Sequence, residues 1–401
     1  MKPEYRYRKK NTFDIPVDKS IVRVWSASSA DSRGQIEKMF LPLAKTGFVH
    51  PYIALMPDWH PGEDAVVGSV VPTRSHLLPA VVGGDIGCGM CAVRLPLQAH
   101  DLEKDFPGIL FKLRENIPVG SAHNSAVTER VEGNPIWEEK INAPITNKVL
   151  RKLMRQFGSL GGGNHFLELQ TDIEGCLWVM LHTGSRYLGI EIRDYYVAES
   201  MKQPGVNVKI CSKIPYIKAD TPLGIDYLQD VETVSRFAQE SRKEIMIRAL
   251  EVLSAYGDVD ISACMTDIIE VRHNYVAMEE HFNEMLYVHR KGAIHLPQGK
   301  PGLVPGSMGT SSYVVEGRGN EFGFCSCAHG GGRAMSRSAA SRKISEATLL
   351  ESMGSVIFKH DINLVEEAPE AYKDIKLVMR GQKDLVKIRF ELTPLVSVKG
   401  R

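Results

Sequence analysis

Residues 80–93 read AVVGGDIGCGMCAV, in which a glycine-rich turn lies between two short apolar runs. Short apolar runs bounded by glycine are typical of buried strands, so Ala80 to Val82 and the run that begins at Ala92 are both predicted to be strands. The turn between them holds Asp85 and Cys88. The stretch therefore predicts a sheet-forming chain with reactive side chains in a glycine loop.

Three further segments are predicted to be strands. Ala65 to Val71 and Leu177 to Leu181 are short apolar runs bounded by turn residues. Val386 to Leu392 (VKIRFEL) alternates strictly between apolar and charged residues, which predicts a half-buried strand.

The clearest predicted helix runs from Asp230 to Tyr256, with apolar residues at largely helical spacing. Asp230 is its expected N-cap and Gly257 its expected stop. Helices are also expected after Asp31 and after Pro369.

The predicted strands and helices do not alternate in βα units, so we expect a mixed α+β fold rather than a doubly wound sheet. No repeat or linker divides the chain, and we expect one sheet-rich domain over residues 1–401 with a central cleft. Residues 97–150 are expected to be a variable region, because residues 101–148 carry the weakest pattern and are expected to hold loops or an insertion.

Composition limits the class of protein. The chain has 49 basic and 48 acidic residues, a formal charge of +1, which argues against a uniformly cationic nucleic-acid binder but allows a local basic groove. No apolar stretch approaches the roughly 20 residues of a membrane span, and the basic segment from Met1 to Lys10 has no apolar run behind it, so neither membrane nor export is expected. The seven cysteines are expected to be reduced thiols of a cytoplasmic protein.

Glycines gather in four clusters, at residues 83–90, 158–165, 305–309 and 329–333. Glycine allows close backbone approach, so that exposed N–H groups can surround an anion. A single glycine loop most often serves only as a turn. Each of these four, however, contains or adjoins a side chain able to bind metal or phosphate.

Asp85 and Cys88 together suit Mn, Fe, Co or Zn, because a carboxylate favours hard ions and a thiolate softer ones. One alternative is that Cys88 is simply a small buried hydrophobe. Another is a structural zinc site in which Cys88 and Cys91 are completed by Cys325 and Cys327.

His165, His182 and His273 supply imidazoles beside glycine loops or strand ends, although a single histidine in such a place is more often a core residue than a ligand. His329 precedes three glycines and Arg333, and a helix is expected over Ala334 to Arg342. A histidine there could attack phosphorus while Arg333 and Arg337 neutralise phosphate charge. The alternative is a tight turn with a capping histidine.

Six motifs in this order resemble the RtcB family of RNA-splicing ligases over most of the chain, from about Ile53 to Gly400. They are GDIGCGM (84–90), GNHFLE (163–168), HTGSR (182–186), HNY (273–275), PGSMG (305–309) and HGGGR (329–333).

The resemblance implies two Mn²⁺ ions and GTP as cofactors. The implied metal ligands are Asp85, Cys88, His165, His182 and His273, with Cys88 shared, and the implied nucleophile is His329. The residues implied to hold the guanine nucleotide are Asn164, His165, Phe166, Leu167, Glu168, His273, Asn274, Pro305, Gly306, Ser307, Met308, Ser312, His329, Gly330, Gly331, Gly332 and Lys399.

The implied activity joins RNA 3′-phosphate or 2′,3′-cyclic phosphate ends to 5′-hydroxyl ends, through a histidine–GMP and an RNA 3′-phosphate–guanylate intermediate. Its implied role is RNA repair or tRNA splicing, and it leaves room for a protein activator. The alternatives are a metal-dependent cyclic-phosphate phosphohydrolase that forms no guanylate, and a non-catalytic RNA-binding factor with a structural metal.

The chain departs from the family pattern in three residues. Gly331 stands where the family usually has Ala, Thr183 where it has Ser, and Trp59 where it has a small aliphatic residue. The stretch between Leu97 and Lys148 is shorter than the family pattern. These differences are typical of a divergent paralogue with a specialised RNA substrate, and none removes an implied ligand.

Overall fold

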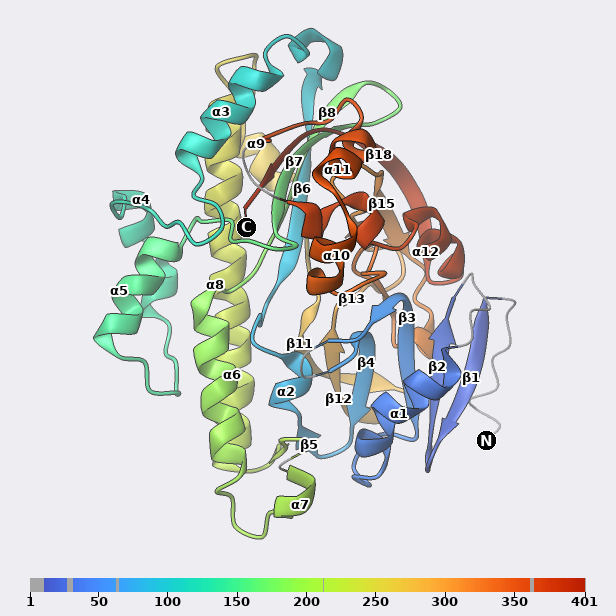
Figure 1. The fold of residues 1–401 in the computed structure, drawn as a ribbon. Helices are drawn as coiled ribbons and strands as arrows, with labels where there is room; N and C mark the ends of the chain where they lie inside the picture. Colours follow the sequence, from blue (N-terminus) through green and yellow to red (C-terminus); the bar gives the residue numbers. More distant parts are fainter. Residues whose placement is uncertain (1–10, 27–31, 63–64, 212, 361–363, 401) are drawn as a thin grey trace.

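A computed structural model of the protein describes residues 11–26, 32–62, 65–211, 213–360 and 364–400, and two large β-sheets dominate them (Figure 1). Neighbouring strands of the first sheet are antiparallel except β2 and β3. In spatial order its strands are β1 (Thr12–Val17), β2 (Ser20–Trp25), β3 (Tyr52–His60), β4 (Val67–Thr73), β12 (Glu284–Lys291) and β11 (Asn274–His281).

The second sheet is antiparallel apart from one short edge strand. In spatial order its strands are β10 (Ile269–Arg272), β6 (Gly89–Gln98), β8 (Cys176–Thr183), β7 (Phe166–Thr171), β18 (Val386–Lys399), β15 (Ser312–Gly317) and β14 (Pro301–Val304), with β17 (Ile357–Phe358) parallel to β18. Two small pairs complete the sheets: β5 (His76–Leu77) with β9 (Ile217–Lys218), and β13 (Ala293–His295) with β16 (Ser326–Ala328).

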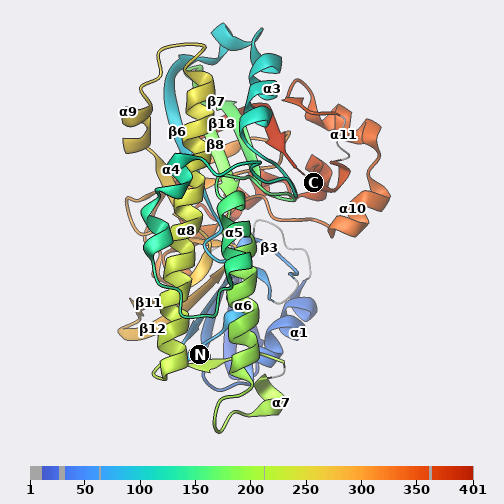
Figure 2. The ribbon, with the colours of Figure 1, turned by 90° about the vertical axis from the view of Figure 1, so that its left-hand side faces the viewer.

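The helices cover the outer faces of the sheets and one end of the molecule (Figures 1 and 2). They are α1 (Arg33–Ala44), α2 (Pro79–Val82), α3 (Phe106–Asn116), α4 (Glu129–Glu132), α5 (Asn147–Gln156), α6 (Tyr187–Ser200), α7 (Val208–Cys211), α8 (Pro222–Leu253), α9 (Ile261–Thr266), α10 (Arg337–Lys343), α11 (Glu346–Met353) and α12 (Ile375–Gly381). Short 3-10 turns occur at Ala99–Leu102, Pro135–Glu138, Glu321–Gly323, Val365–Glu367 and Pro369–Ala371.

The two sheets pack face to face between helical layers. In β6, Met90 and Ala92 join Val70 of β4 in the hydrophobic cluster between the sheets. Cys91 and Val93 join the cluster under α3 and α8 instead, because successive side chains of a strand point to opposite faces. The far face of the first sheet packs on α1. The fold is therefore a four-layer α/β/β/α sandwich, which confirms the mixed α+β class.

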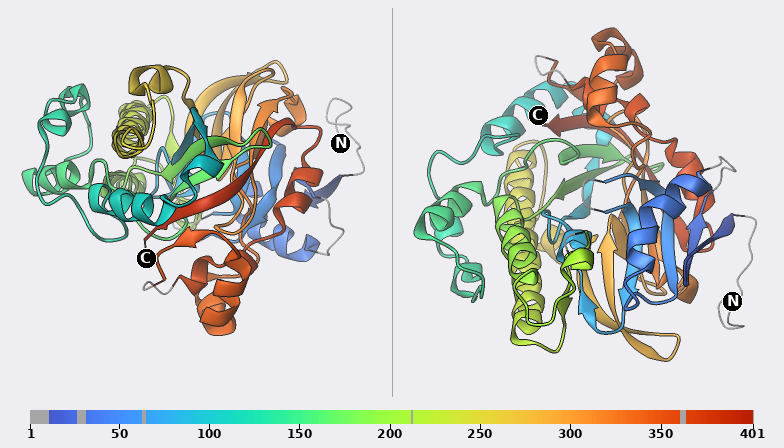
Figure 3. Two further views of the ribbon diagram at one scale, coloured as in Figure 1. Left: turned by 90° about the horizontal axis from the view of Figure 1, so that it is seen from above. Right: turned by 60° about the horizontal axis from the view of Figure 1, so that its bottom comes forward.

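Views from the side and above show α6 and α8 side by side on one flank, with α4 and α5 outside them (Figures 2 and 3). α10 and α11 form a projecting lobe with its own small hydrophobic cluster (Figure 3).

The predicted strands from Ala65, Leu177 and Val386 are confirmed as β4, β8 and β18. The burial of β18 differs from a simple alternation, since Ile388 is 47% exposed. Val314 of β15 pairs with Phe390 and Val315 with Ile388, so that one extra residue of β18 forms a bulge here. A bulge breaks the alternation of faces and turns Ile388 to solvent.

The long predicted helix is confirmed as α8, but its predicted ends were wrong. The helix begins at Pro222, and its N-cap is Thr221, whose hydroxyl accepts the N–H of Gly224. Asp230 lies inside the helix and is buried, and its carboxylate accepts the Tyr196 hydroxyl at 2.7 Å. The helix ends at Leu253, before Gly257. A proline at the first helical position is itself a start signal.

Four other boundary predictions need correction. Ala80 to Val82 forms part of α2, in which Val81 and Val82 are buried. Three apolar residues are too few to distinguish a strand from a helix in the sequence. Residues 101–148 contain the amphipathic helix α3 as well as loops. The helix expected from Ala334 begins only at Arg337, capped by Ser336. After Pro369 there is a 3-10 turn before α12.

α1 begins at Arg33, as expected, while Asp31 and the basic segment from Met1 to Lys10 lie outside the described residues. All seven cysteines are free thiols. No helix in the described ranges is long and apolar enough to cross a membrane.

Candidate functional site

Four of the predicted metal ligands lie at one end of the second sheet. Cys88 immediately precedes β6, and His165 precedes β7. His182 is the last residue but one of β8, and His273 follows β10. In adjacent antiparallel strands the start of one lies beside the end of the next. The register agrees, since His182 pairs with both Met90 and Phe166. The sheet order therefore brings together motifs that are far apart in the sequence.

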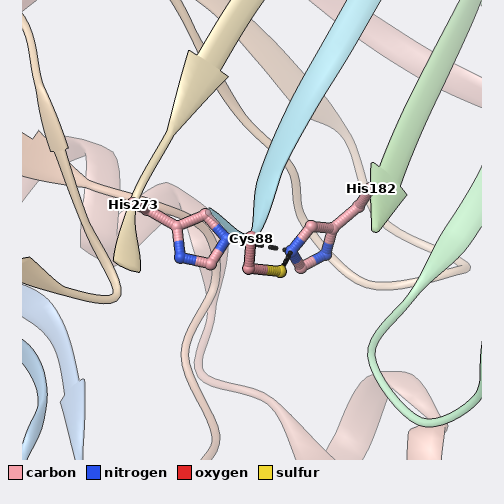
Figure 4. A group of neighbouring side chains, drawn as sticks. All are labelled: Cys88, His182 and His273. Atoms are coloured by element: carbon pink, nitrogen blue, oxygen red, sulfur yellow. Dashed lines mark hydrogen bonds between the residues drawn. The ribbon is translucent and has the colours of Figure 1, made fainter. Parts of the chain in front are cut away.

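The ligand atoms of these side chains form a compact group, and Figure 4 shows three of the side chains, Cys88, His182 and His273. Cys88 Sγ lies 3.3 Å from His182 Nε2 and 3.5 Å from His165 Nε2. His182 Nε2 lies 3.0 Å from His273 Nε2. Two sets of atoms, one from Cys88, His182 and His273 and one from Asp85, Cys88 and His165, each lie within 4.8 Å of one another. The side chains could thus hold a metal ion in either set, and Cys88 belongs to both.

The hydrogen bonds of the imidazoles fit a bound cation. His182 Nδ1 lies 3.1 Å from the Asn164 carbonyl oxygen, and His273 Nδ1 lies 3.2 Å from the Asn274 side-chain oxygen. Both oxygens accept, so each ring carries its proton on Nδ1. The lone pairs of the two Nε2 atoms then face each other and Cys88, an arrangement that a metal ion between them would stabilise.

Burial controls protonation in this group. It lowers the pKa of His182 well below the usual range, with help from the positive charge that His273 would carry. Burial likewise raises the pKa of the Cys88 thiol, with Asp85 adding to the effect. Burial opposes ionisation of Asp85, but its hydrogen bond from His165 holds the pKa of that carboxyl well below its usual range. The site supplies neutral imidazoles and a carboxylate, and a cation would favour the thiolate.

The close approach of Asp85 depends on Gly184. A β-carbon at position 184 would lie 2.0 Å from Asp85 Oδ1. Thr183, beside it, donates its hydroxyl to the Leu160 carbonyl at 2.7 Å, a bond that serine in the same place could also make.

The structural zinc alternative is wrong. Cys88 lies among the histidines, whereas Cys91 packs under α8 in the hydrophobic cluster on the other face of the sheet. Cys327 belongs to the cluster between the two sheets. These thiols therefore face separate layers and do not converge.

His329 follows β16 directly and lies beside the metal-ligand group. Its ring centroid is 4.6 Å from that of His273. Asp58, which is fully buried, accepts hydrogen bonds through Oδ2 from the His329 ring Nδ1 at 2.6 Å and from the His329 backbone N–H at 3.1 Å. The carboxylate fixes the ring proton on Nδ1, so that the lone pair on Nε2 is available to attack an electrophile.

A cavity of about 260 Å³ joins these groups to the glycine loops. The predicted site residues that line it are Asp85, Cys88, Asn164, Phe166, Glu168, His182, His273, Asn274, Pro305, Gly306, Ser307, Met308, His329, Gly330, Gly331, Gly332 and Lys399.

Three predicted nucleotide residues are not in that lining. His165 lies behind it with the metal ligands. The Leu167 side chain packs in the cluster on the opposite face of the sheet, as its neighbour Phe166 faces the other way. Ser312 is buried, and its hydroxyl oxygen accepts the Gly306 N–H at 3.3 Å. It therefore supports the loop that lines the cavity.

Glu168 and Lys399 provide opposite charges at the cavity wall. Glu168 accepts hydrogen bonds from Gln170 at 2.7 Å and from Ser397 at 3.1 Å. Burial raises the pKa of Glu168 to about 7, although Lys399 acts in the opposite direction. Lys399 reaches the cavity because the last strand, β18, pairs with β7 and places Lys399 opposite Phe166.

Glu367, which no sequence pattern indicates, forms ion pairs with the basic side chains at this wall of the cavity. It is 1% exposed, and its carboxylate lies 3.3 Å from Lys399 Nζ, 3.1 Å from Arg333 Nη1 and 3.7 Å from Arg337 Nε. The Tyr372 hydroxyl donates to it as well. Arg333 is thus held by Glu367, whereas the Arg337 side chain is 52% exposed and lines the cavity.

Asp58 and Glu367 lie outside the six motifs quoted above, and the role of each depends on partners that are distant in the sequence. Asp58 carried a weak signal, because it follows an apolar run and lies two residues before His60. Glu367 carried none.

Comparison with known proteins agrees with this arrangement. A family model described as tRNA-splicing ligase RtcB matches residues 40–135 and 122–400. The RNA-splicing ligase RtcB of Escherichia coli is 35% identical over 414 aligned residues, which cover 96% of this chain and 99% of that protein. The RNA-splicing ligase RtcB of Mycobacterium tuberculosis is 30% identical, covering 86% of this chain and 96% of its own. The tRNA-splicing ligase RtcB of Aeropyrum pernix is 27% identical, and the alignment covers 82% of this chain and 84% of that protein.

Proposed function

The chain belongs to the RtcB family of tRNA-splicing ligases, and from that premise we propose that it joins broken RNA ends at the expense of GTP. The ends are a 3′-phosphate or 2′,3′-cyclic phosphate on one RNA and a 5′-hydroxyl on the other, as in RNA repair or tRNA splicing. The observation that carries the proposal is the position of His329, oriented by Asp58 and 4.6 Å from His273 in ring centroids.

His329 is the nucleophile of the first step. Its Nε2 lone pair attacks the α-phosphorus of GTP, a nitrogen–phosphorus bond forms, and the bond to the β-phosphate oxygen breaks to release pyrophosphate. The Nδ1 proton stays in its hydrogen bond to Asp58, which stabilises the positive charge that develops on the ring.

Later steps return His329 to its starting state. A 2′,3′-cyclic phosphate end is first hydrolysed by water to a 3′-phosphate. An oxygen of the RNA 3′-phosphate then attacks the same phosphorus, the phosphorus–nitrogen bond to His329 breaks, and an anhydride forms. The 5′-hydroxyl of the second RNA then attacks the 3′-phosphate, loses its proton and expels GMP, which leaves a phosphodiester. Arg337 is the cation that is half exposed at the cavity, and it can neutralise phosphate charge in each step.

Asp85, Cys88, His165, His182 and His273 are proposed to hold two Mn²⁺ ions, with the Cys88 sulfur shared. Supporting this, both groups of candidate ligand atoms contain Cys88. A carboxylate, a thiolate and imidazoles together suit a borderline divalent ion. Such ions, when bound, neutralise charge on phosphate oxygens.

Glu168 and Lys399 are proposed to select guanine. An ionised Glu168 can accept the ring N–H and amino group of guanine, while the Lys399 ammonium can donate to the guanine carbonyl oxygen. Adenine offers neither pattern. Both side chains line the cavity that contains His329. We place the reaction in the cytoplasm, where thiols such as Cys88 remain reduced.

The proposal is tested by incubating the full chain with GTP labelled at the α-phosphate and Mn²⁺. We expect acid-labile label on wild-type protein and none on His329→Ala. His100→Ala, at a side chain 69% exposed, is the matched control and should be labelled like wild type.

The same assay separates the alternatives. A metal-dependent phosphohydrolase would open an RNA cyclic phosphate without GTP and would stay unlabelled. A non-catalytic RNA-binding factor would do neither. Wild-type protein that stays unlabelled over several divalent metals would overturn the ligase proposal.

A further inference from the structure

A second and larger cavity, of about 570 Å³, adjoins the one that contains His329. His60 and Arg333 line both cavities, so the two share a wall. The rest of the second cavity is lined mainly by apolar side chains and serines, together with Gln35 and Asp374. Two further residues of its lining, Trp59 and Lys373, are of particular interest. None of the roles proposed above uses it.

Trp59 offers an aromatic surface at a rigid position. It lies near the end of β3, and its main chain is pressed against Gly68 of β4, where a β-carbon would lie 2.8 Å from the Trp59 Cα. The side chain is partly buried. Among the described residues the indole N–H has no hydrogen-bond partner. The ring thus combines a fixed apolar face with an unused donor.

Lys373 brings a positive charge to the same cavity. Its Nζ lies 4.9 Å from the Trp59 ring centroid and donates to the main-chain carbonyls of Pro57, at 3.3 Å, and of Trp59. Among the described residues no carboxylate lies within 4.0 Å of this ammonium. Asp374, the acid in the lining, instead caps α12 by accepting the Lys376 N–H at 2.8 Å. No described carboxylate thus forms an ion pair with the Lys373 ammonium, which lies at the cavity wall.

We propose that this cavity binds the terminal nucleotide of one of the two RNA ends, with its base against Trp59 and a phosphate beside Lys373. The inference rests on the proposed function, because it assumes that RNA ends react at His329. An aromatic face next to a cation is the usual pattern for binding unpaired nucleotides. Through the wall formed by His60 and Arg333, such a nucleotide lies next to the reaction cavity.

The charged state of Lys373 is consistent with this role. Burial lowers the pKa of Lys373 to about 8, while Asp58 acts in the opposite direction. The ammonium is therefore mostly protonated at neutral pH, and a bound phosphate would stabilise it further.

The first test uses photo-crosslinking with the full chain and no GTP. Two RNAs of about ten nucleotides each carry 5-iodouridine at the terminal position, one at a 3′-phosphate end and the other at a 5′-hydroxyl end. We expect one of the two to crosslink to Trp59, which identifies the RNA end that the cavity holds. Crosslinks from both RNAs that all map elsewhere would overturn the proposal.

The second test measures the affinity of the same RNAs by fluorescence anisotropy. Base–aromatic stacking predicts that Trp59→Ala weakens binding of the crosslinking RNA by about tenfold, and Trp59→Phe by about threefold or less. Lys373→Met should weaken it to a similar extent and reduce its salt dependence. Trp137→Phe is the matched control, because Trp137 donates its N–H to Val131 and lines neither cavity.

The outcomes separate the two proposals. If wild-type protein binds and crosslinks the RNA but never acquires labelled GMP, the RNA site stands and the ligase mechanism fails. If GMP labelling succeeds while Trp59→Ala binds both RNAs as wild type does, the mechanism stands and the RNA site is wrong.

Discussion

The Asp58 carboxylate at the end of β3 holds the His329 imidazole, with Oδ2 and Nδ1 2.6 Å apart. The same oxygen also accepts the His329 backbone N–H, so the side chain fixes both the ring and the main chain of its partner. The other oxygen, Oδ1, is buried and has no partner among the described residues. A buried carboxylate with one oxygen unpaired is costly for stability, which is typical of a residue kept for function.

Asp58→Asn should nearly abolish attachment of GMP to His329. The amide can donate to Nδ1 and so stabilise the tautomer with its proton on Nε2, which cannot attack phosphorus. A change of this kind costs about 10⁴-fold in a comparable triad, and we expect a fall of at least about 100-fold in the rate of labelling. The fold should be retained, because the substitution removes a buried charge. Labelling at the wild-type rate, with normal Mn²⁺ content, would show that Asp58 does not orient the nucleophile.

Cys88→Ser and Cys91→Ser form a matched pair. Both thiols are buried, but only Cys88 lies among the candidate metal ligands. Cys88→Ser should lower the affinity for Mn²⁺ by at least about tenfold and remove most of the rise in melting temperature that Mn²⁺ produces.

Cys91→Ser should instead lower the free energy of unfolding by about 1–3 kcal/mol, because it buries a hydroxyl in an apolar cluster. Its metal content, measured by mass spectrometry, should match wild type. Equal metal loss in the two variants would contradict the ligand assignment.

Individual strands could be predicted from the sequence better than the way in which they pair. The strands Leu177 to Leu181 and Val386 to Leu392 were predictable because burial on one or both faces leaves a local pattern. The pairing of β18 with β7, which carries Lys399 to the cavity, depends on contacts between distant segments, and no local pattern reports it.

Functional side chains were predictable where a glycine loop marks them and not where their partners are remote. Asp85 and His329 adjoin glycines. The role of Glu367 could not be predicted, because its partners Lys399 and Arg333 come from other segments of the chain. Asp230 illustrates the opposite error: an acidic residue before an apolar run resembles an N-cap, yet it is a buried acceptor for Tyr196.

Discrimination of GTP from ATP should depend on pH through Glu168. Burial raises the pKa of this carboxyl to about 7, so it is ionised above that pH and protonated below it. Only the ionised form accepts both guanine donors, and the selectivity, Kd for ATP over Kd for GTP, should therefore fall as the pH decreases from about 8 to about 6.

Calorimetric titration gives this ratio, and effects of pH on the metal ligands and on the phosphates cancel in it. Glu168→Gln should show a low ratio that does not change with pH. The stability of the fold changes with pH in the opposite direction to the selectivity. Between about pH 4.5 and 7 the folded state binds more protons at Glu168 than the unfolded state does. The contribution of Glu168 to the free energy of unfolding therefore decreases as the pH rises through this window. A wild-type ratio that is flat with pH would exclude Glu168 as the guanine acceptor.

Gly331→Ala and Gly332→Ala should differ sharply, although they are neighbours in one loop. A β-carbon at Gly331 would find its nearest atom, the Lys373 carbonyl oxygen, at 3.7 Å, an ordinary contact. The alanine that the family usually has there should fit, and it should stabilise the fold by about 0.4–1 kcal/mol by restricting the unfolded chain. GMP labelling should stay near wild type.

At Gly332 the φ angle is +69°, and a β-carbon would lie 1.9 Å from the Asp58 carbonyl oxygen. The loop or the end of β3 must therefore shift in Gly332→Ala, and either movement separates Asp58 from His329. We expect a loss of more than about 2 kcal/mol in the free energy of unfolding, and labelling reduced as strongly as in Asp58→Asn. Thermal unfolding and GMP labelling of both variants test this, and a Gly332→Ala protein with normal labelling would show that the Asp58–His329 contact does not depend on the close approach of this loop.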